Sequence, residues 1–196
     1  MNELRSSSPR PEEGKSPRLT IRMASGGVIV LELCPQWAPN ACNSVIALAQ
    51  AGAYDGMTID RIVPGFVLQP RYLDEGRPDL DYFIDGEFEA NGFSGNPPVT
   101  QGVVAMAGDG ESLSSGSCFF IALGDHPRLT GHFTAIGRVA EGWDEVKRLE
   151  SVELEPVDVG LEAVVNRPVQ PEVMERVSVD TFGVSYSPPV ILRRAY

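Results

Sequence analysis

The sequence predicts a mainly β fold, an antiparallel barrel or sandwich, with two short helices. About eight short runs have the β-branched and aromatic composition of strands, and turn residues separate most of them. Only two stretches have the 3.6-residue apolar period of a helix. Strands and helices do not alternate, which argues against a doubly wound parallel sheet. The 196 residues, 42% of them hydrophobic, suit one domain with a single core.

The first third of the chain contains four predicted strands and one helix. The strands are expected at residues 19–23, 28–33, 57–63 and 66–69. A Gly-Gly turn between the first two predicts a hairpin, and Pro64-Gly65 separates the last two. The helix is expected at residues 38–52, because Pro39 suits a first turn, Gly52 suits a C-terminal cap and the apolar residues form one stripe.

The rest of the chain contributes four more predicted strands and the second helix. These strands are expected at residues 102–107, 117–122, 132–139 and 175–182. The helix is expected at residues 142–151, where apolar side chains recur on one face. Residues 70–102 are rich in Gly, Asp, Asn and Pro and are interpreted as mainly loop, with a candidate short strand at 82–88. A second long loop is expected at residues 152–173.

The chain divides into one predicted domain, residues 18–183, and two tails. Residues 1–17 are mostly polar and predict a flexible N-terminal tail, and residues 184–196 are interpreted as a C-terminal tail. The N-terminus lacks the apolar region of a secretory signal, and no stretch is apolar over the length that spans a bilayer. We therefore expect a cytoplasmic protein that does not bind membranes.

Charge and residue content exclude several classes of function. The formal net charge of −11 disfavours nucleic acid and anionic membranes as partners. The cysteines Cys34, Cys42 and Cys118 match no zinc spacing and no disulfide framework, and the only histidines are His126 and His132. Nucleophile-elbow, Walker and dinucleotide-binding motifs are absent. We expect no metal, no cofactor and no acid–base or nucleophilic chemistry. Nothing in the sequence indicates an oligomer, so a monomer is the default expectation.

The stretch TIDRIVPGFVLQP, residues 58–70, places one Arg among apolar residues of two predicted strands. Arg is rarely buried without a partner. Arg61 therefore either lies on the outside of the sheet, where its stem covers apolar surface, or faces a site that uses a fixed positive charge. The residues alone leave both interpretations open.

Several blocks follow one another in a fixed order: DRIVPGFVLQ, GVVAMA, GSCFFIA, and LGDHPRLTG leading into HFTAIGRV. Together they resemble the cyclophilin family of peptidyl-prolyl cis–trans isomerases over residues 19–182, and several ordered blocks are more specific than one motif. The resemblance implies a closed eight-stranded antiparallel β-barrel capped by two α-helices. It also implies a cofactor-free isomerase acting on X–Pro bonds of peptides or unfolded proteins, in folding or in a regulatory switch.

The same resemblance assigns candidate site residues to a shallow apolar groove on the outside of the barrel. Arg61 matches the catalytic Arg of the family. The residues that match the proline pocket are Phe66, Val67, Phe120 and Leu129. The other substrate-binding matches are Gln69, Met106, Ala107 and Phe133. Adjacent strand residues face opposite sides of a sheet, so Phe120 in the groove implies Phe119 in the core.

Five departures from the family pattern bear on this site. The family His before the Arg is Asp60, and the Gly after the Gln is Pro70, which lacks a backbone donor. The Asn after Met-Ala is Gly108, and the Gln before Phe-Phe is Cys118. The Trp before the pocket Leu is Arg128, which argues against tight cyclosporin binding.

The departures at Asp60, Pro70, Gly108 and Cys118 motivate one rival to the enzyme, a proline-peptide binding module that has lost most turnover. A third alternative is a structural barrel whose surface binds a partner without any prolyl pocket. The retained Arg favours the enzyme.

Overall fold

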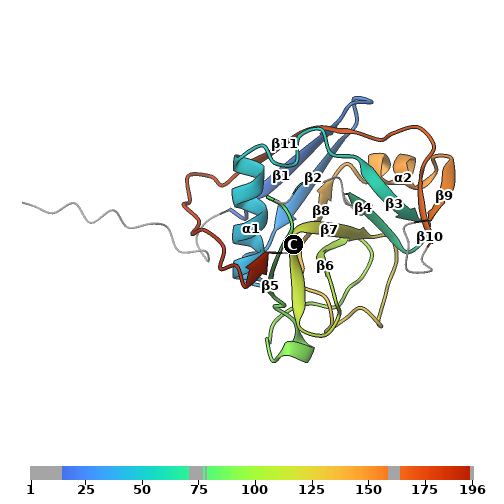
Figure 1. Cartoon of the computed structure of the whole chain (residues 1–196). Helices are drawn as coiled ribbons and strands as arrows, with labels where there is room; N and C mark the ends of the chain where they lie inside the picture. The colour runs from blue at the N-terminus through green and yellow to red at the C-terminus, as the bar shows by residue number, and fades with distance from the viewer. Residues whose placement is uncertain (1–14, 71–76, 78, 159–163, 195–196) are drawn as a thin grey trace, which may run out of the picture.

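The computed structural model describes residues 15–70, 77, 79–158 and 164–194, and its strands curl into a half-barrel flanked by two helices (Figure 1). The strands that follow one antiparallel path, in sheet order, are β11 (Met174–Asp180), β1 (Arg18–Met23), β2 (Val28–Leu33), β8 (Ala135–Glu141), β6 (Val103–Gly108), β7 (Leu113–Ala122), β4 (Val67–Pro70) and β3 (Ile59–Val63). Strand β5 (Tyr82–Asp85) branches from this path, pairing with β7 and with β12 (Arg193–Arg194). A separate hairpin consists of β9 (Leu154–Asp158) and β10 (Val164–Pro168). The helical elements are α1 (Pro39–Gln50), α2 (Trp143–Glu150) and a 3₁₀ turn, η1 (Glu89–Asn91).

The closed eight-stranded barrel implied by the resemblance is wrong for this chain. In the part of the chain that the structure describes, the terminal strands β3 and β11 form no ladder, and an isolated bridge between Thr58 and Val173 connects their ends. One backbone bond at this bridge runs from Met174 N–H to the Met57 carbonyl at 2.7 Å. Beyond the bridge, the β9–β10 hairpin packs against β3. The sheet is therefore an open half-barrel, and the expectation of a mainly β fold with two helices is confirmed.

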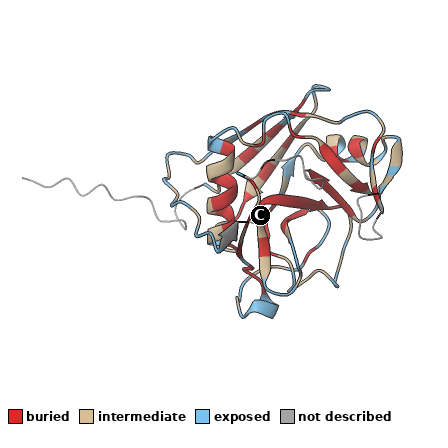
Figure 2. Cartoon of the chain, viewed as in Figure 1, coloured by how far each residue is buried: buried red, intermediate tan, exposed pale blue. Residues whose placement is uncertain are grey.

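Alternation along the strands gives the sheet two apolar faces. Phe119 and Ile121 of β7 point into the main core, whereas Phe120 and Ala122 belong to a second cluster on the other face. Buried residues run along the strands and along the sheet-facing side of α1 (Figure 2). The members of this second group, which we name the outer cluster, are Val67, Val99, Ala105, Phe120 and Ala122, with Val63, Phe66, Leu129 and Phe133 packed against them. The outer cluster provides the apolar surface on which a site can form.

Two segments that were not predicted as strands are strands. Residues 154–158 and 164–168 form the two strands of the β9–β10 hairpin, in which Pro156 lies opposite Asn166. A two-stranded sheet has an open edge, where the N–H that Pro lacks is not needed. Strand β7 begins at Leu113, earlier than expected, because its polar first half pairs with β5. Gly116 suits this stretch because a Cβ there would lie 1.9 Å from the Tyr82 ring.

The two tails differ in what the structure describes. Residues 1–14 of the predicted N-terminal tail lie outside the described residues. In the C-terminal tail, Asn40 forms paired hydrogen bonds with the backbone of Val190 at 2.7 and 3.0 Å, and β12 then pairs with β5. Among the residues described, no helix has the length and apolar character needed to cross a membrane.

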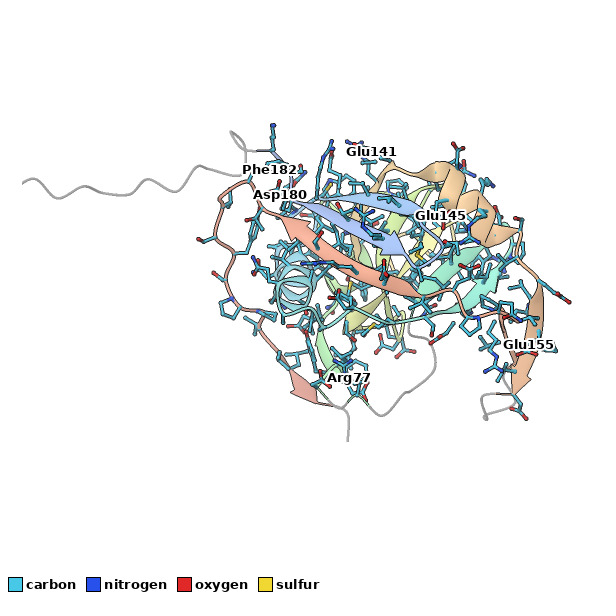
Figure 3. All side chains as sticks on the ribbon, turned by 90° about the horizontal axis from the view of Figure 1, so that it is seen from above. Arg77, Glu141, Glu145, Glu155, Asp180 and Phe182 are labelled. Carbon is cyan, nitrogen blue, oxygen red and sulfur yellow. The ribbon has the colours of Figure 1, made fainter. Side chains whose placement is uncertain are left out.

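Ion pairs are present at α2 and at the β9–β10 hairpin, where Figure 3 labels Glu145 and Glu155. Arg148 of α2 contacts Glu145 at 2.8 Å and Glu172, just before β11, at 2.7 Å. Glu155 and Arg167 pair across the β9–β10 hairpin at 2.8 Å. Arg148 is part-buried and bonds each of its two carboxylates through two nitrogens, whereas the Glu155–Arg167 pair is exposed and contributes little free energy.

The N-terminus of α1 is capped from a distant part of the chain. The buried Glu87 accepts the N–H groups of Asn40 at 3.0 Å and Ala41 at 2.8 Å, one on each carboxylate oxygen. Ala38, at the N-cap position, has no capping side chain, so Glu87 satisfies donors that would otherwise lack a partner. Burial raises the pKa of Glu87, the two N–H bonds oppose the rise, and nearby Asp85 adds to it.

Replacing Glu87 should therefore destabilise the fold. We expect Glu87→Ala to lower the free energy of unfolding by about 2–4 kcal/mol, because two buried donors lose their acceptor. Glu87→Gln, with one acceptor oxygen, should lose about half of that. Urea unfolding monitored by circular dichroism would measure both, with the exposed Glu175→Ala as a control. A Glu87→Ala loss no larger than that of the control would contradict the capping role.

Candidate active site

A groove of about 230 Å³ lies on the outer face of the sheet, over the outer cluster. Strands β3, β4, β6 and β7 and the segment before β8 contribute to it (Figure 1). The groove is lined by Arg61, Phe66, Val67, Gln69, Ala107, Gly108, Phe120, Leu129 and Phe133. One Arg and one Gln at the edge of an otherwise mostly apolar surface suit a ligand that is itself largely apolar.

A β-bulge in β3 turns Arg61 toward the groove. Strict alternation would put Ile59 and Arg61 on one face, yet Ile59 and Ile62 both pack in the main core. The pairing with β4 shifts at this point, because Ile59 lies opposite Pro70 and Arg61 lies opposite Gln69. Asp60 is the extra residue of the bulge, a device that often redirects a side chain beside an active site.

Arg61 is held at the groove by neighbours on β4 and the β3–β4 turn. Its Nη1 donates a hydrogen bond to Gln69 Oε1 at 3.1 Å. The guanidinium carbon lies 5.8 Å from the centroid of the Phe66 ring, within range of a cation–π contact. Gln69 is itself buried, and its Nε2 donates to Cys118 Sγ at 3.1 Å. Gln69 and Phe66, the two groups that contact the guanidinium here, are both uncharged.

Aromatic contacts form the floor and walls of the groove. Phe120 and Phe133 meet edge to face, with ring centroids 5.8 Å apart. Phe66 meets His126 in the same way at 4.8 Å, and His126 Nε2 lies 2.9 Å from the Phe66 carbonyl oxygen. His126 was not among the predicted site residues; it supports Phe66 and does not line the groove. Its only signal was its position in the turn that precedes the pocket residue Leu129.

The structure brings eight of the nine predicted site residues to this groove, namely Arg61, Phe66, Val67, Gln69, Ala107, Phe120, Leu129 and Phe133. Met106 is the exception, because its side chain is fully buried in the main core. Alternation along β6 explains the difference. Ala105 belongs to the outer cluster and Ala107 lines the groove, so Met106 between them must face the other way.

Gly108 lines the groove at the end of β6, and a tight loop then leads into β7. A Cβ at Gly108 would lie 2.3 Å from the Leu113 carbonyl oxygen, so the larger family residue would not fit this hairpin. Asp109 Oδ1 accepts the N–H groups of Glu111, Ser112 and Leu113, each at 2.9 Å. Desolvation raises the pKa of Asp109, but these backbone bonds outweigh it and the net pKa lies below its ordinary value.

Asp60, which replaces a family His, does not line the groove. Its buried side chain accepts a hydrogen bond from the Thr58 hydroxyl, and it borders a separate depression beside Arg167 and Pro168. Pro70, which also departs from the family pattern, is the last residue of β4. Its carbonyl oxygen accepts a hydrogen bond from the Cys118 thiol at 3.4 Å. Within the residues that the structure describes, no three His, Cys, Asp or Glu side chains are arranged to hold a metal ion.

Comparisons with known proteins agree with this geometry. Residues 18–179 match the family model of the cyclophilin-type peptidyl-prolyl cis-trans isomerases. A peptidyl-prolyl cis-trans isomerase of Arabidopsis thaliana is 32% identical over 154 residues, which cover 77% of this chain and 90% of the relative. Peptidyl-prolyl cis-trans isomerase B of Bacillus subtilis is 35% identical over 133 residues, 66% of this chain and 87% of the relative.

A solved structure shares the fold. The cyclophilin-type isomerase of Cryptosporidium parvum, crystallised in the presence of the dipeptide Ala-Pro, superimposes with a TM-score of 0.68 at 19% identity, covering 84% of this chain and 99% of that protein. The family model spans most of the chain, and the curated relatives are named for the same activity. The chain therefore belongs to the cyclophilin-type peptidyl-prolyl cis–trans isomerases and is an enzyme of that class.

Proposed function

We propose that the enzyme rotates X–Pro bonds in exposed peptide segments by stabilising the twisted amide, with Arg61 as the catalytic residue. The observation that carries the proposal is the position of one Arg beside four apolar pocket residues in a single groove. The proposed clients are unfolded or flexible proteins in the cytoplasm, so the activity would assist folding. The relative crystallised in the presence of Ala-Pro supports a short proline peptide as the first probe.

The physical requirements of this reaction match the residues of the groove. Amide resonance sets a rotation barrier of about 18–20 kcal/mol, and uncatalysed X–Pro exchange takes on the order of tens to hundreds of seconds. In the twisted transition state the resonance is lost and the prolyl nitrogen regains a lone pair. The reaction requires no nucleophile and no proton transfer. A catalyst must hold the ring, exclude water and donate a hydrogen bond to that nitrogen.

In the proposed complex, the apolar residues hold the proline ring and Arg61 supplies the donor. The ring would lie on the outer cluster, enclosed by Phe66, Val67, Phe120 and Leu129. Gln69 and Ala107 would contact the peptide backbone, and Phe133 would close the end of the pocket. A guanidinium has only hydrogen-bond donors and no acceptor, which suits it to bond a nitrogen lone pair. Its bond to nitrogen exists only when the amide is twisted, so it favours the transition state over the bound substrate.

The Arg accounts for part of the rate enhancement. A charge-assisted hydrogen bond is worth about 1.5–3 kcal/mol, which corresponds to roughly ten- to a hundredfold in rate. Positioning of the ring and the low local polarity must supply the remainder.

Arg61→Ala should lower turnover much more than peptide affinity. We expect the catalysed exchange rate of an Ala-Pro tetrapeptide to fall roughly ten- to a hundredfold, with the dissociation constant within about threefold of wild type. NMR exchange spectroscopy measures the rate and a chemical-shift titration measures the affinity. The exposed Arg22→Ala is the matched control for loss of one positive charge. Equal losses of rate and affinity would contradict the assigned role. A wild-type protein that binds the peptide without accelerating exchange would instead be the binding module.

Phe120→Ala should lower peptide affinity, which Arg61→Ala should leave nearly unchanged. Phe120 forms the floor of the groove, so its removal takes away the surface that holds the ring in both ground and transition states. We expect the dissociation constant of the same peptide to rise about tenfold or more, which is the effect of losing one well-buried aromatic contact. Phe182→Ala, at an exposed position after β11, is the control. Unchanged affinity in Phe120→Ala would place the ring elsewhere.

The loop at residues 109–113, next to the groove residue Gly108, should respond to acid through Asp109. Because its pKa is lowered in the folded protein, the three backbone bonds are retained above the ordinary Asp value and lost as the pH falls through the lowered value. We expect the amide resonances of Glu111, Ser112 and Leu113 to titrate with a midpoint below that ordinary value. Asp109→Asn keeps an acceptor oxygen and should remove the transition. A midpoint at or above the ordinary value would contradict the capped loop.

A further inference from the structure

We infer that Cys118 is a positioning residue for Arg61, acting through the side chain of Gln69; the inference rests on the proposed role of Arg61. Three strands supply the parts, with Arg61 on β3, Gln69 on β4 and Cys118 on β7. These strands are neighbours in the sheet, in the order β7, β4, β3. The side chains therefore form a row across the sheet that ends at the groove.

The row is a hydrogen-bonded relay in which each group donates to the next one. Arg61 Nη1 donates to Gln69 Oε1 at 3.1 Å, and Gln69 Nε2 donates to Cys118 Sγ at 3.1 Å. The Cys118 thiol then donates to the Pro70 carbonyl at 3.4 Å. Gln69 and Cys118 are both buried, so water does not readily replace these partners.

The thiol determines which way the Gln69 amide faces. A thiol carries one proton and, once that proton is directed to a carbonyl, presents sulfur lone pairs as a weak acceptor. Only the NH₂ end of the amide can bond to such an acceptor, so the oxygen is directed toward Arg61. Arg has donors and no acceptor, and the reversed amide would place two donors against each other. Cys118 therefore selects the amide orientation that binds the guanidinium.

The backbone around Cys118 supports this role. The ladder between β4 and β7 includes the pairs Val67–Ala122 and Leu68–Ile121. Cys118 precedes these residues of β7 and lies beyond the paired stretch. Its N–H donates to Ser115 Oγ at 2.9 Å, and its thiol donates to the carbonyl of Pro70 at the end of β4. The thiol contact thus links β7 to the last residue of β4 and fixes the sulfur beside Gln69.

The expected consequence is preorganisation rather than substrate contact. Gln69 is neutral, so it holds the guanidinium without cancelling its charge. Cys118 is absent from the groove lining and acts on the Arg through the amide. Loss of the relay should lower the fraction of time in which the guanidinium is correctly placed, and so lower turnover while the apolar pocket still binds proline.

The test compares Cys118→Val with Cys118→Ser in the full chain. Val removes the donor and the acceptor at similar volume, and we expect a roughly five- to tenfold lower saturated exchange rate, the size of one ordinary hydrogen bond. The peptide dissociation constant should stay within about twofold. Ser keeps a donor and an acceptor and should restore most of the rate. Cys34→Val, at another buried cysteine remote from the relay, controls for loss of a thiol and should leave the rate unchanged.

A double-mutant cycle separates this inference from the proposed function. If Cys118 acts through Arg61, Cys118→Val should have no further effect on the rate in the Arg61→Ala background. The same rate loss in both backgrounds, or a wild-type rate in Cys118→Val while Arg61→Ala is slow, would overturn the relay and leave the role of Arg61 intact. A wild-type rate in Arg61→Ala itself would overturn the proposed function.

A further measurement covers the case in which Cys118→Val is poorly folded. Cys118→Ala also lacks the donor and acceptor but adds no branched side chain. In this variant, ¹⁵N relaxation of the Arg61 side-chain Nε–H should report greater motion than in wild type and in Cys118→Ser. Equal mobility in all three proteins would contradict the positioning role.

Discussion

The bulge at Asp60 is the constraint on which the geometry of the groove depends. Ile59 and Ile62 both pack in the main core, although three positions separate them. In a regular strand that started with Ile59 inside, Arg61 would also point inside, where an unpaired charge is very costly. The extra residue lets both isoleucines remain buried while Arg61 lies opposite Gln69 and lines the groove. One bulge in the edge strand β3 therefore keeps both isoleucines in the core and places the candidate catalytic Arg in the groove.

The same sheet supports the groove because both of its faces are apolar. β7 sends Phe119 into the main core and Phe120 into the outer cluster, so one strand contributes to stability and to the pocket at once. A sheet with one polar face would offer no such floor. The chain has a formal net charge of −11, yet the side chain beside this floor is the positively charged Arg61. Its guanidinium donates a hydrogen bond to the neutral side chain of Gln69. Substrate recognition by such a surface depends mainly on shape and apolar contact.

Much of this arrangement was predictable from the sequence, and the exceptions have physical causes. The family resemblance carried by the ordered motifs predicted that Phe120 and Phe133 would lie with Arg61, and alternation along β7 added that Phe119 faces the core. Met106 matched by motif, but the alternation of β6 turns it into the core between Ala105 and Ala107. The β9–β10 hairpin was missed because Pro156 and Pro168 are typical of loops, and a two-stranded sheet tolerates them at its edge. The closed barrel was wrong because closure depends on pairing between β3 and β11, two strands more than a hundred residues apart in sequence.

The sequence by itself determined the β-rich class, the two helices and the residue types of the groove, because strand periodicity and short motifs are local properties of the chain. Only the tertiary structure decided how these residues combine. The bulge at Asp60, the Glu87 carboxylate on the distant N-terminus of α1, and the contacts of Gln69 with Arg61 and Cys118 all join separate strands or segments. Such contacts depend on the register of one strand against another, which no single stretch of sequence contains.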